Sequence, residues 1–368
     1  MRISGFFLRL NGMKTYCLFI CLTFVTISSF SQTAKYSNEF LSIGVGARPL
    51  SMGRAVVSHN DDVSSGYWNP AGLSSLKSTY QGMFMHSEYF AGIAKYDYGA
   101  VSRRIDSVSG MALSVIRFGI DDIPNTINLI NSNGQIDYSR ISSFSAQDYG
   151  FFLSYGRKLG AVPGLRIGGS AKVVRRTLGE FGNSWGFGID AGLQYSKGKW
   201  SFGLMARDIS TTFNAWTYNL DERTKEVFIQ TGNSIPENSM EITLPQFIAG
   251  ASRKMLFRKF SALLELNAVV TTDGMRNTFI KSNIFSIDPQ AGIELGYYDI
   301  VFLRAGICNV QEIEDAGRKI QTAQPNFGLG VKLFNLRLDY ALTNVGDVTG
   351  LLTHVFSLQA NINAKGKM

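Results

Sequence analysis

The sequence is poor in the residues that build disulfide frameworks and zinc sites. Its 368 residues include only three cysteines, Cys17, Cys21 and Cys308. The first two lie in a stretch typical of removable export signals, which leaves Cys308 alone in the exported chain. A single cysteine cannot form an intramolecular disulfide, and no Cys/His spacing matches a zinc site. We therefore expect no disulfide-stabilised domain and no metal.

Histidine is equally scarce, and the three histidines give no catalytic signature. His59 lies close to Asp61 in the sequence, but spacing alone places no serine beside it as a nucleophile. The polar groups around His59 are better explained as partners for backbone donors and acceptors in a packed segment. We therefore predict a non-enzymatic protein without a cofactor.

The sequence also lacks charge and long apolar runs. Only 17% of its residues are charged, while 38 are glycine and 8 are proline. The apolar stretch at 17–25 falls well short of the roughly 20 residues that a membrane-spanning helix needs. A chain that is sparing in charge yet never continuously hydrophobic is typical of a transmembrane β-barrel, in which lipid-facing and lumen-facing residues alternate.

Residues 1–31 have the pattern of a cleaved export signal. Arg2, Arg9 and Lys14 precede the apolar stretch, and Ser29-Phe30-Ser31 offers small residues for cleavage. Loss of these three cations lowers the formal net charge from +8 to +5. So small and scattered a charge does not indicate nucleic-acid binding.

Alternation with a period of two dominates the rest of the chain. In residues 184–196, large apolar residues alternate with Gly, Asp and Gln, which gives one face for lipid and one small, polar face for a lumen. About fourteen such segments occur, at 78–86, 91–102, 108–118, 146–158, 165–175, 184–196, 200–209, 246–252, 260–271, 287–297, 300–309, 325–334, 336–342 and 353–361. The sequence therefore predicts an all-β fold, a transmembrane antiparallel barrel of about 14 strands over residues 78–368.

The connections between these segments alternate in length and in charge. If the first strand runs outward, the outer loops are long and the inner turns are short, as in outer-membrane barrels. Basic pairs such as Arg103-Arg104, Arg157-Lys158 and Arg258-Lys259 fall at inner turns, and acidic residues fall in outer loops. We expect contact with lipids, including lipopolysaccharide, through anionic head groups; ordinary solvated turns are the alternative.

The alternation also predicts the positions of two groups of side chains, one at the membrane interfaces and one in the lumen. Aromatic residues near strand ends are predicted to form girdles at the membrane interfaces: Tyr96, Tyr98, Trp185, Trp200, Tyr297 and Tyr298. Charged residues at lumen-facing positions are predicted to form ion pairs that hold a plug: Lys172, Arg175, Asp190, Arg207, Glu265, Glu294, Arg304, Lys332, Arg337 and Asp339. Their mixed signs do not fit a wide conducting pore of one sign.

The long outer connection 210–245 is predicted to be a recognition loop. Exposed aromatic clusters are costly unless they fold inward or are covered by a partner. The candidate partner-binding residues in this loop are Phe213, Trp216, Tyr218 and Phe228.

Residues 32–77 lie between the export signal and the strands, where a plug for a barrel would be placed. Their glycines permit positive φ or close backbone approach, and Pro70 biases Asn69 away from the α region. Such a segment makes tight, irregular turns in a confined space. The residues expected to build it are Gly44, Gly46, Arg48, Gly53, Asn60, Asp61, Trp68, Asn69, Pro70 and Gly72.

The ordered series from Gly44-Val45-Gly46-Ala47-Arg48 to Trp68-Asn69-Pro70-Ala71-Gly72-Leu73 resembles the N-terminal hatch of the PorV/PorQ proteins of Bacteroidetes. These proteins are a branch of the FadL-like outer-membrane barrels. The resemblance implies a hatch, residues 32–77, inside the lumen of a barrel in the cell outer membrane. It also implies an accessory role in type IX protein secretion, with a translocon or exported substrate proteins as partners.

Two other functions would use the same hatch. FadL-like relatives admit hydrophobic small molecules through a hatch-gated pocket, so a channel with a hydrophobic ligand is the main alternative. A structural subunit of another outer-membrane assembly is the third. Copurification with a very large barrel protein would favour secretion or assembly, whereas copurified lipid or loss of uptake on deletion would favour transport.

Overall fold

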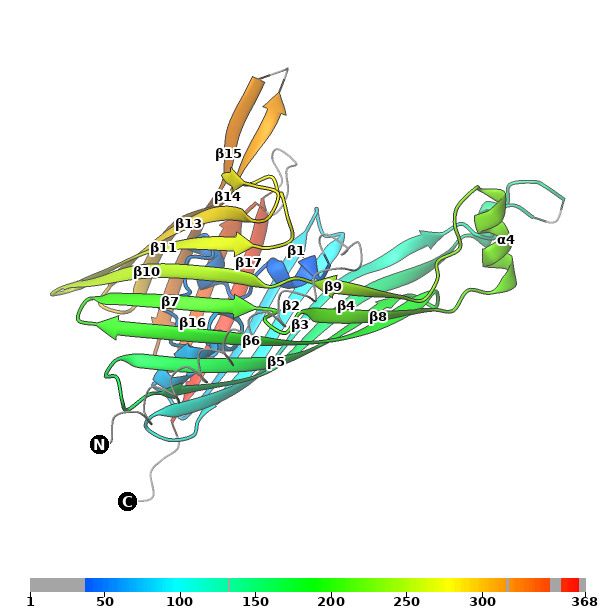
Figure 1. Ribbon diagram of the computed structural model, residues 1–368. Helices are drawn as coiled ribbons and strands as arrows, with labels where there is room; N and C mark the ends of the chain where they lie inside the picture. The colour runs from blue at the N-terminus through cyan, green and yellow to red at the C-terminus, as the bar shows by residue number, and fades with distance from the viewer. Residues whose placement is uncertain (1–36, 132, 316–317, 345–351, 364–368) are drawn as a thin grey trace, which may run out of the picture. The chain divides into compact units, whose positions relative to one another are not determined.

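The alternating segments pair edge to edge into a closed antiparallel barrel (Figure 1). The ring closes where β1 (Tyr80–Tyr89) pairs with β17 (Thr353–Ile362). The other wall strands are β2 (Ala94–Arg104), β3 (Ser109–Asn125), β4 (Ser142–Lys158), β5 (Leu165–Leu178), β6 (Gly182–Lys197), β7 (Trp200–Arg207), β10 (Gln246–Phe257), β11 (Phe260–Thr271), β13 (Ser286–Tyr297), β14 (Val301–Asp315), β15 (Arg318–Leu333) and β16 (Leu336–Thr343). Fourteen strands thus form the wall, and the predicted fold class is confirmed. Closure leaves no unpaired strand edge in the lipid.

The computed structural model describes residues 37–131, 133–315, 318–344 and 352–363, without the side chains of 313–318. All of them belong to one unit, Lys35–Met368. The predicted export signal, residues 1–31, lies outside the described residues. Within the described residues, no helix is both long and apolar enough to cross a membrane.

Three short strands extend the wall beyond the fourteen. β8 (Thr212–Tyr218) pairs with the first half of β6, β9 (Ser239–Thr243) pairs with β8, and β12 (Ile280–Lys281) pairs with β13. The prediction that 210–245 is one loop is therefore wrong. Only 219–238 connects β8 to β9, and it contains the helix α4 (Glu222–Gln230).

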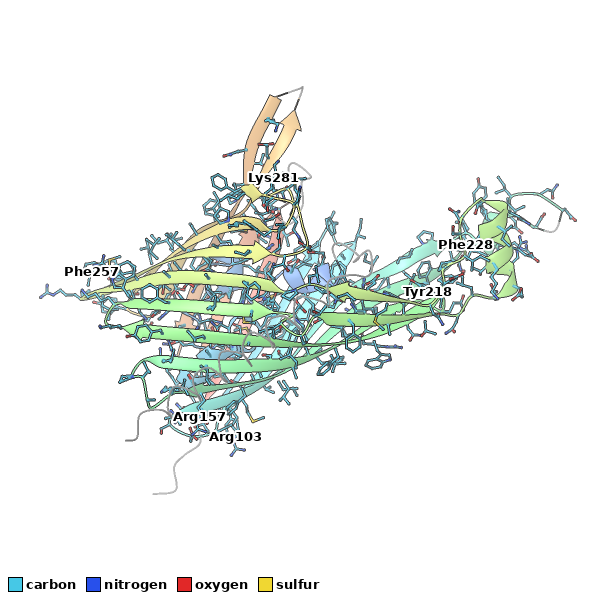
Figure 2. All side chains as sticks on the ribbon, viewed as in Figure 1. Arg103, Arg157, Tyr218, Phe228, Phe257 and Lys281 are labelled. Atoms are coloured by element: carbon cyan, nitrogen blue, oxygen red, sulfur yellow. The ribbon has the colours of Figure 1, made fainter. Side chains whose placement is uncertain are left out.

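The two ends of the barrel differ in their connections. At one end, six short turns follow β2, β4, β6, β10, β13 and β15, and we call this the short-turn end. At the other end, the long-loop end, β3 and β4 run well beyond their predicted limits, and the connection 179–181 between β5 and β6 is short. Part of the predicted outer-loop length is thus extended strand. In Figure 2, Arg103, Arg157 and Phe257 lie toward the short-turn end, and Tyr218 and Phe228 lie away from it.

The wall has an apolar outer face and a small, polar inner face. Trp185, Trp200, Tyr297 and Tyr298 are exposed on the outside, as predicted for girdles. The prediction that Tyr96 and Tyr98 belong to a girdle is wrong, because both side chains are 0% exposed. The alternation of β2 points its even-numbered residues into the barrel, and its outward positions at this level carry Lys95 and Asp97 instead.

Residues 38–76 lie inside the ring of strands, and we call them the internal segment. It contains four short helical turns, η1 (Glu39–Ser42), α2 (Ala47–Ser51), α3 (Ser65–Trp68) and η2 (Pro70–Ser75). The α2 turn contacts β14 to β17, and η2 contacts β2 to β6. Most of its residues are buried, including Trp68 and Pro70. The segment therefore fills the bore from one side of the wall to the other.

Candidate functional site

The Asn69-Pro70 corner fastens the internal segment to the wall. Asn69 has an extended backbone (φ −162°), as the following proline requires, and its Oδ1 accepts a hydrogen bond from the N–H of Ala71 at 3.2 Å. Its Nδ2 donates to the carbonyl of Val57 at 2.9 Å and to that of Leu193 on β6 at 3.1 Å. One amide therefore caps η2, ties two parts of the segment together and reaches a wall carbonyl.

Glycines on the inner face of the wall leave room for this segment. These wall glycines are Gly110, Gly156, Gly168, Gly203, Gly292 and Gly306. A Cβ atom added at any of them would overlap backbone atoms of the internal segment. The overlapping atoms belong to Leu73, Pro70, Val57, Met52 and Gly53 among others. The small lumen face that the sequence shows is thus a contact surface for the segment, and an open pore would not need it.

A buried charge cluster holds the segment near the short-turn end. Arg48 donates through Nε to Oε2 of Glu294 at 2.9 Å and through Nη2 to Oε1 at 3.4 Å, a bidentate pair. Arg304 reaches the same carboxylate at 2.6 Å, and Arg337 lies 3.6 Å from it. Asp339 pairs with Arg304 at 2.9 Å and with Arg337 at 2.9 Å. We call these five residues the arginine cluster.

Nine of the ten predicted lumen-facing charges do face inward, and several pair as predicted. Lys172 is 3% exposed and contacts Asp190 at 2.8 Å and Asp208 at 2.6 Å. Arg175 is the exception, since its guanidinium lies 4.7 Å from the ring centroid of Trp185 on the outer face. Only Arg48 carries a positive charge from the segment into the arginine cluster.

Single hydrogen bonds from wall side chains spread the attachment around the wall. Glu265 on β11 accepts the backbone N–H of Ser58 at 2.7 Å. Ser154 on β4 and Ser170 on β5 both donate to the carbonyl of Gly66 at 3.0 Å. These wall groups satisfy backbone groups that irregular turns leave without partners of their own. Sequence reasoning missed the two serines, whose only signal was a small polar residue at an inward-facing position.

An aromatic cluster fills the interior toward the long-loop end. Trp68 donates through Nε1 to the carbonyl of Val45 at 2.9 Å, and its ring meets that of Tyr67 edge-on at 4.9 Å. Arg207 lies over Tyr67 at 4.4 Å and over Trp68 at 5.4 Å, a cation–π arrangement. Wall residues complete the hydrophobic cluster with the segment: Tyr89, Tyr96, Tyr98, Phe118, Ile116 and Phe152. We call this set, with Phe40, the aromatic cluster.

The hydroxyl of Tyr96 has no hydrogen-bond partner among the described residues. Tyr96 is 0% exposed, its ring lies 6.0 Å from that of Tyr89, and it lies 6.2 Å from Phe118. Burying an unpaired hydroxyl costs free energy, and native proteins rarely do so without a reason. The aromatic cluster therefore offers a donor that an entering molecule could use.

A polar cavity of about 230 Å³ opens at the short-turn end beneath the arginine cluster. Arg48, His59 and Asp61 from the internal segment line it, and Lys77 pairs with Asp61 at 3.1 Å. Burial lowers the pKa of His59 to about 4, so the ring is neutral at pH 7. Burial alone would raise the pKa of Asp61, but the charge of Lys77 and its neighbours lowers it below its ordinary value.

The predicted hatch residues do not all act alike. Gly44, Gly46 and Gly53 have positive φ of 97°, 84° and 60°, which only glycine adopts freely. Gly72 has no positive φ, and a Cβ there would overlap the carbonyl of Asn60. Asn60 accepts from Arg48 Nη1 at 3.3 Å and so positions its guanidinium.

The four predicted recognition residues are not brought together in one loop. Phe213, Trp216 and Tyr218 lie on β8 in the wall, where Trp216 stacks on Tyr218 at 5.8 Å. Arg176 of β5 lies 5.1 Å from the Trp216 ring. Phe228 is separate, on α4. The loop assignment fails because alternation continues through 212–218, and partner binding by these residues stays a prediction.

No protein-family model and no curated protein sequence matches this chain. Solved structures do. CymD, a monoaromatic hydrocarbon channel, superposes with a TM-score of 0.54 at 13% identity, covering 88% of this chain and 99% of its own. The Ralstonia pickettii toluene transporter TbuX gives 0.52 at 13%, and the P. putida toluene transporter TodX gives 0.52 at 12%. Each covers 87% of this chain and 99% of its own.

The fold is that of the FadL-like outer-membrane barrels. Closed antiparallel barrels with an apolar outer face are typical of outer-membrane proteins, and the predicted location fits this fold. At these identities the likeness is one of fold. The structural neighbours do not single out the PorV/PorQ branch.

Proposed function

We propose that this chain is an outer-membrane channel for hydrophobic small molecules, in which the internal segment acts as a hatch. The observation that carries the proposal is the aromatic cluster. The interior of a porin is polar because it holds water. Here the long-loop half of the bore is lined by Tyr96, Tyr98, Phe118 and other rings, which would repel ions and favour apolar or aromatic solutes.

The neighbours support the same substrate class. Two of them are described as toluene transporters and one as a monoaromatic hydrocarbon channel. A one-ring hydrocarbon stacks favourably on aromatic side chains, either offset or edge-on. In this proposal, Tyr98 and Phe118 contact the solute, and the free hydroxyl of Tyr96 favours solutes that carry a hydrogen-bond acceptor.

The first turn of the internal segment is the part best placed to move. η1 is held at the long-loop end by partly exposed polar contacts: Arg276 pairs with Glu39 at 3.1 Å, and Asn38 donates to Thr243 at 2.9 Å. Partly exposed pairs contribute little, typically below about 1 kcal/mol each. The arginine cluster fixes Arg48 further down. We therefore expect entry to require displacement of η1, with α2 remaining in place.

Uptake into proteoliposomes tests this proposal. Phe118→Arg places a charge in the aromatic cluster and is expected to reduce toluene uptake more than tenfold, because a desolvated charge disfavours an apolar solute. Phe228→Arg, on α4 outside the wall, is the matched control and should leave uptake unchanged. Uptake by the wild-type barrel no faster than by empty liposomes would reject the channel, as would full uptake by the Phe118→Arg barrel.

A role in protein secretion is the second candidate, because apolar side chains are exposed on the connections at the long-loop end. Tyr138 is 74% exposed, Ile229 on α4 is 65% exposed and Ile136 is 62% exposed. Figure 1 shows α4 beyond the ends of the wall strands. Such residues are typical of surfaces that bind other proteins. Exported substrate proteins or a translocon would be the partners.

Affinity purification from native outer membranes separates the two candidates. Replacement of 219–238 by a short Gly/Ser turn removes α4 but keeps β8 and β9 paired. The secretion role predicts loss of copurifying outer-membrane or exported proteins with normal insertion and unchanged hydrocarbon uptake. The same partners recovered from the shortened protein would exclude α4 as the binding surface.

A further inference from the structure

An apolar groove of about 370 Å³ lies on the outer face of the barrel next to the short turns. It spans the ends of β11, β13 and β14, which the register places side by side: Ala262 lies opposite Leu295, and Leu295 lies opposite Leu303. Leu295 and Leu303 are 45% and 56% exposed and face the lipid. The groove is therefore open to the membrane and closed to the lumen.

The groove exists because one small residue interrupts a row of large ones. On β11 the outward side chains are Phe260, Ala262 and Leu264, and Phe260 and Leu264 are 59% and 45% exposed. Phe260 packs against Tyr297 with ring centroids 4.9 Å apart, which forms one wall. The methyl group of Ala262 cannot fill the space between these neighbours. A flexible hydrocarbon chain from the surrounding membrane can fill it.

Two cations lie in the sequence between Phe257 and Phe260, both of which line the groove. Arg258 and Lys259 form the short turn between β10 and β11, and both are exposed. Lys259 lies 5.1 Å from the ring centroid of Tyr298, and its carbonyl accepts the N–H of Tyr298 at 2.7 Å. Neither cation has a carboxylate partner among the residues that the structure describes. Asp299, in the turn between β13 and β14, pairs with Lys332 at 2.5 Å.

Cation–aromatic pairs at the same end mark the level of the membrane interface. Arg253 lies 5.3 Å from the ring of Trp200, and Arg103 lies 5.8 Å from that of Tyr80. Aromatic rings and basic residues of this kind sit at the head-group level of a bilayer. Arg258 and Lys259 are thus at head-group depth, while Ala262 and Leu295 lie one step deeper among the acyl chains.

We propose that this groove and its turn form a binding site for one glycerophospholipid with an anionic head group. An acyl chain lies along Ala262, Leu295 and Leu303, and the phosphate contacts Arg258 and Lys259. The cations alone would attract any anion, and the groove alone would take any acyl chain. Because the cations and the groove lie next to each other, at head-group and acyl-chain depth, they favour a molecule that has both an anionic group and an acyl chain. The site is on the outside of the wall, so it is independent of the proposed channel.

Native mass spectrometry of the detergent-solubilised barrel tests the head-group half of the site. Phosphatidylglycerol should bind more tightly than phosphatidylethanolamine of the same chain length. A cation near a lipid head group contributes about 1 kcal/mol, which corresponds to about fivefold in affinity. Arg258→Gln with Lys259→Gln should therefore weaken phosphatidylglycerol binding about 25-fold. Phosphatidylethanolamine carries the same phosphate, but its ammonium group offsets the attraction to the two cations, so its binding should weaken less. Equal affinity of the wild-type protein for the two lipids would overturn the proposal.

A matched pair of cations elsewhere on the rim separates this site from diffuse attraction. Arg157→Gln with Lys158→Gln removes the same charge from the end of β4, on a strand that does not line the groove. The proposal predicts a loss of less than about fivefold for this control, attributable to long-range charge alone. A loss as large as that of the Arg258/Lys259 variant would show that the basic rim attracts lipid without a defined site.

The apolar half is tested by filling the groove. Ala262→Trp should abolish bound phosphatidylglycerol while leaving both cations in place, and Ala171→Trp at an exposed outer position of β5 should not. Thermal stability measured on both variants confirms that the barrel is intact. Undiminished lipid binding by the Ala262→Trp barrel would contradict the proposed seat of the acyl chain.

Discussion

The two halves of the barrel interior are built from different chemistry. Toward the short-turn end, Arg48 of the internal segment is held by a buried carboxylate, Glu294, that two further arginines share. Toward the long-loop end, the interior is aromatic, and η1 is held by partly exposed contacts such as Arg276 with Glu39. A buried, shared pair is costly to break, whereas partly exposed pairs are weak. The internal segment is therefore held more firmly at the short-turn end than at the long-loop end.

Removal of the Glu294 carboxylate should destabilise the attachment of the internal segment at the short-turn end. Glu294→Gln leaves Arg48, Arg304 and Arg337 with Asp339 as the one carboxylate remaining in the arginine cluster. Breaking a buried pair from one side typically costs about 3–5 kcal/mol. We expect a loss of that size in the free energy of unfolding, measured by urea titration of the barrel in detergent. Glu226→Gln on the exposed face of α4 is the control and should change it by less than about 0.5 kcal/mol.

The Asn69-Pro70 corner fixes the internal segment without any charge, unlike the arginine cluster. Asn69→Ala with Pro70→Ala removes the amide that donates to the carbonyls of Val57 and Leu193, at a cost of about 1–3 kcal/mol, although Gln194 still donates to Val57 at 3.0 Å. No ladder bond between strands passes through these residues. We therefore expect a looser segment in an intact barrel, seen as higher ion conductance in planar bilayers with normal strand content by circular dichroism. Conductance equal to that of the wild type would show that the corner is not needed for closure.

Acid should loosen the anchored half through His59. The pKa of this buried ring is about 4 in the packed state and about 6.5 when released, so the released state binds more protons between these values. Burial of the neutral His59 ring contributes fully to the free energy of unfolding above pH 6.5. This contribution falls by on the order of 2 kcal/mol as the pH drops toward 4. The difference in melting temperature between wild type and His59→Gln should shrink over this range. A pH-independent difference would exclude His59 as the responsible group.

The smallest effect is expected in the aromatic half. Tyr96→Phe removes a buried hydroxyl that has no partner among the described residues. Removing an unsatisfied polar group without changing shape is nearly neutral or stabilising, by up to about 1 kcal/mol. Thermal unfolding measures this directly, and Tyr98→Phe should behave alike, because the Tyr98 hydroxyl also has no partner among the described residues. A clear loss of stability in Tyr96→Phe would mean that the hydroxyl has a partner in solution.

The strands could be predicted from the sequence because alternation is a local signal. All fourteen predicted segments overlap wall strands. Residues 38–76 of the predicted plug are mostly buried, and their role as a plug stays a prediction. The orientation of Tyr96 could not be predicted reliably, because β2 carries Lys95 and Asp97 on its outer face and so lacks a purely apolar face at that level. In β8, alternation was present but hidden inside a stretch that looked like a loop.

The pairing inside the barrel was beyond sequence reasoning for a different reason. Alternation indicated that Glu294 and Arg304 face the lumen, and mixed signs indicated ion pairs. It could not show that Arg48 meets Glu294, since the two are 246 residues apart and only the closure of the ring brings them together. The glycines of the lumen face posed the same problem. Their role as contacts for the internal segment depends on which strands that segment crosses.

Cys308 offers the most direct measurement of whether the internal segment closes the bore. It is a free thiol on β14, 0% exposed and facing inward, and Gly306 beside it touches the segment at Gly53. The measurement is the labelling of Cys308 by a small charged maleimide, read by mass mapping of the Cys308 peptide. We predict no labelling in the folded wild-type barrel and rapid labelling in Gly306→Val, whose side chain displaces the segment, with Gly82→Val as the unlabelled control. Rapid labelling of the wild-type barrel would contradict a closed bore.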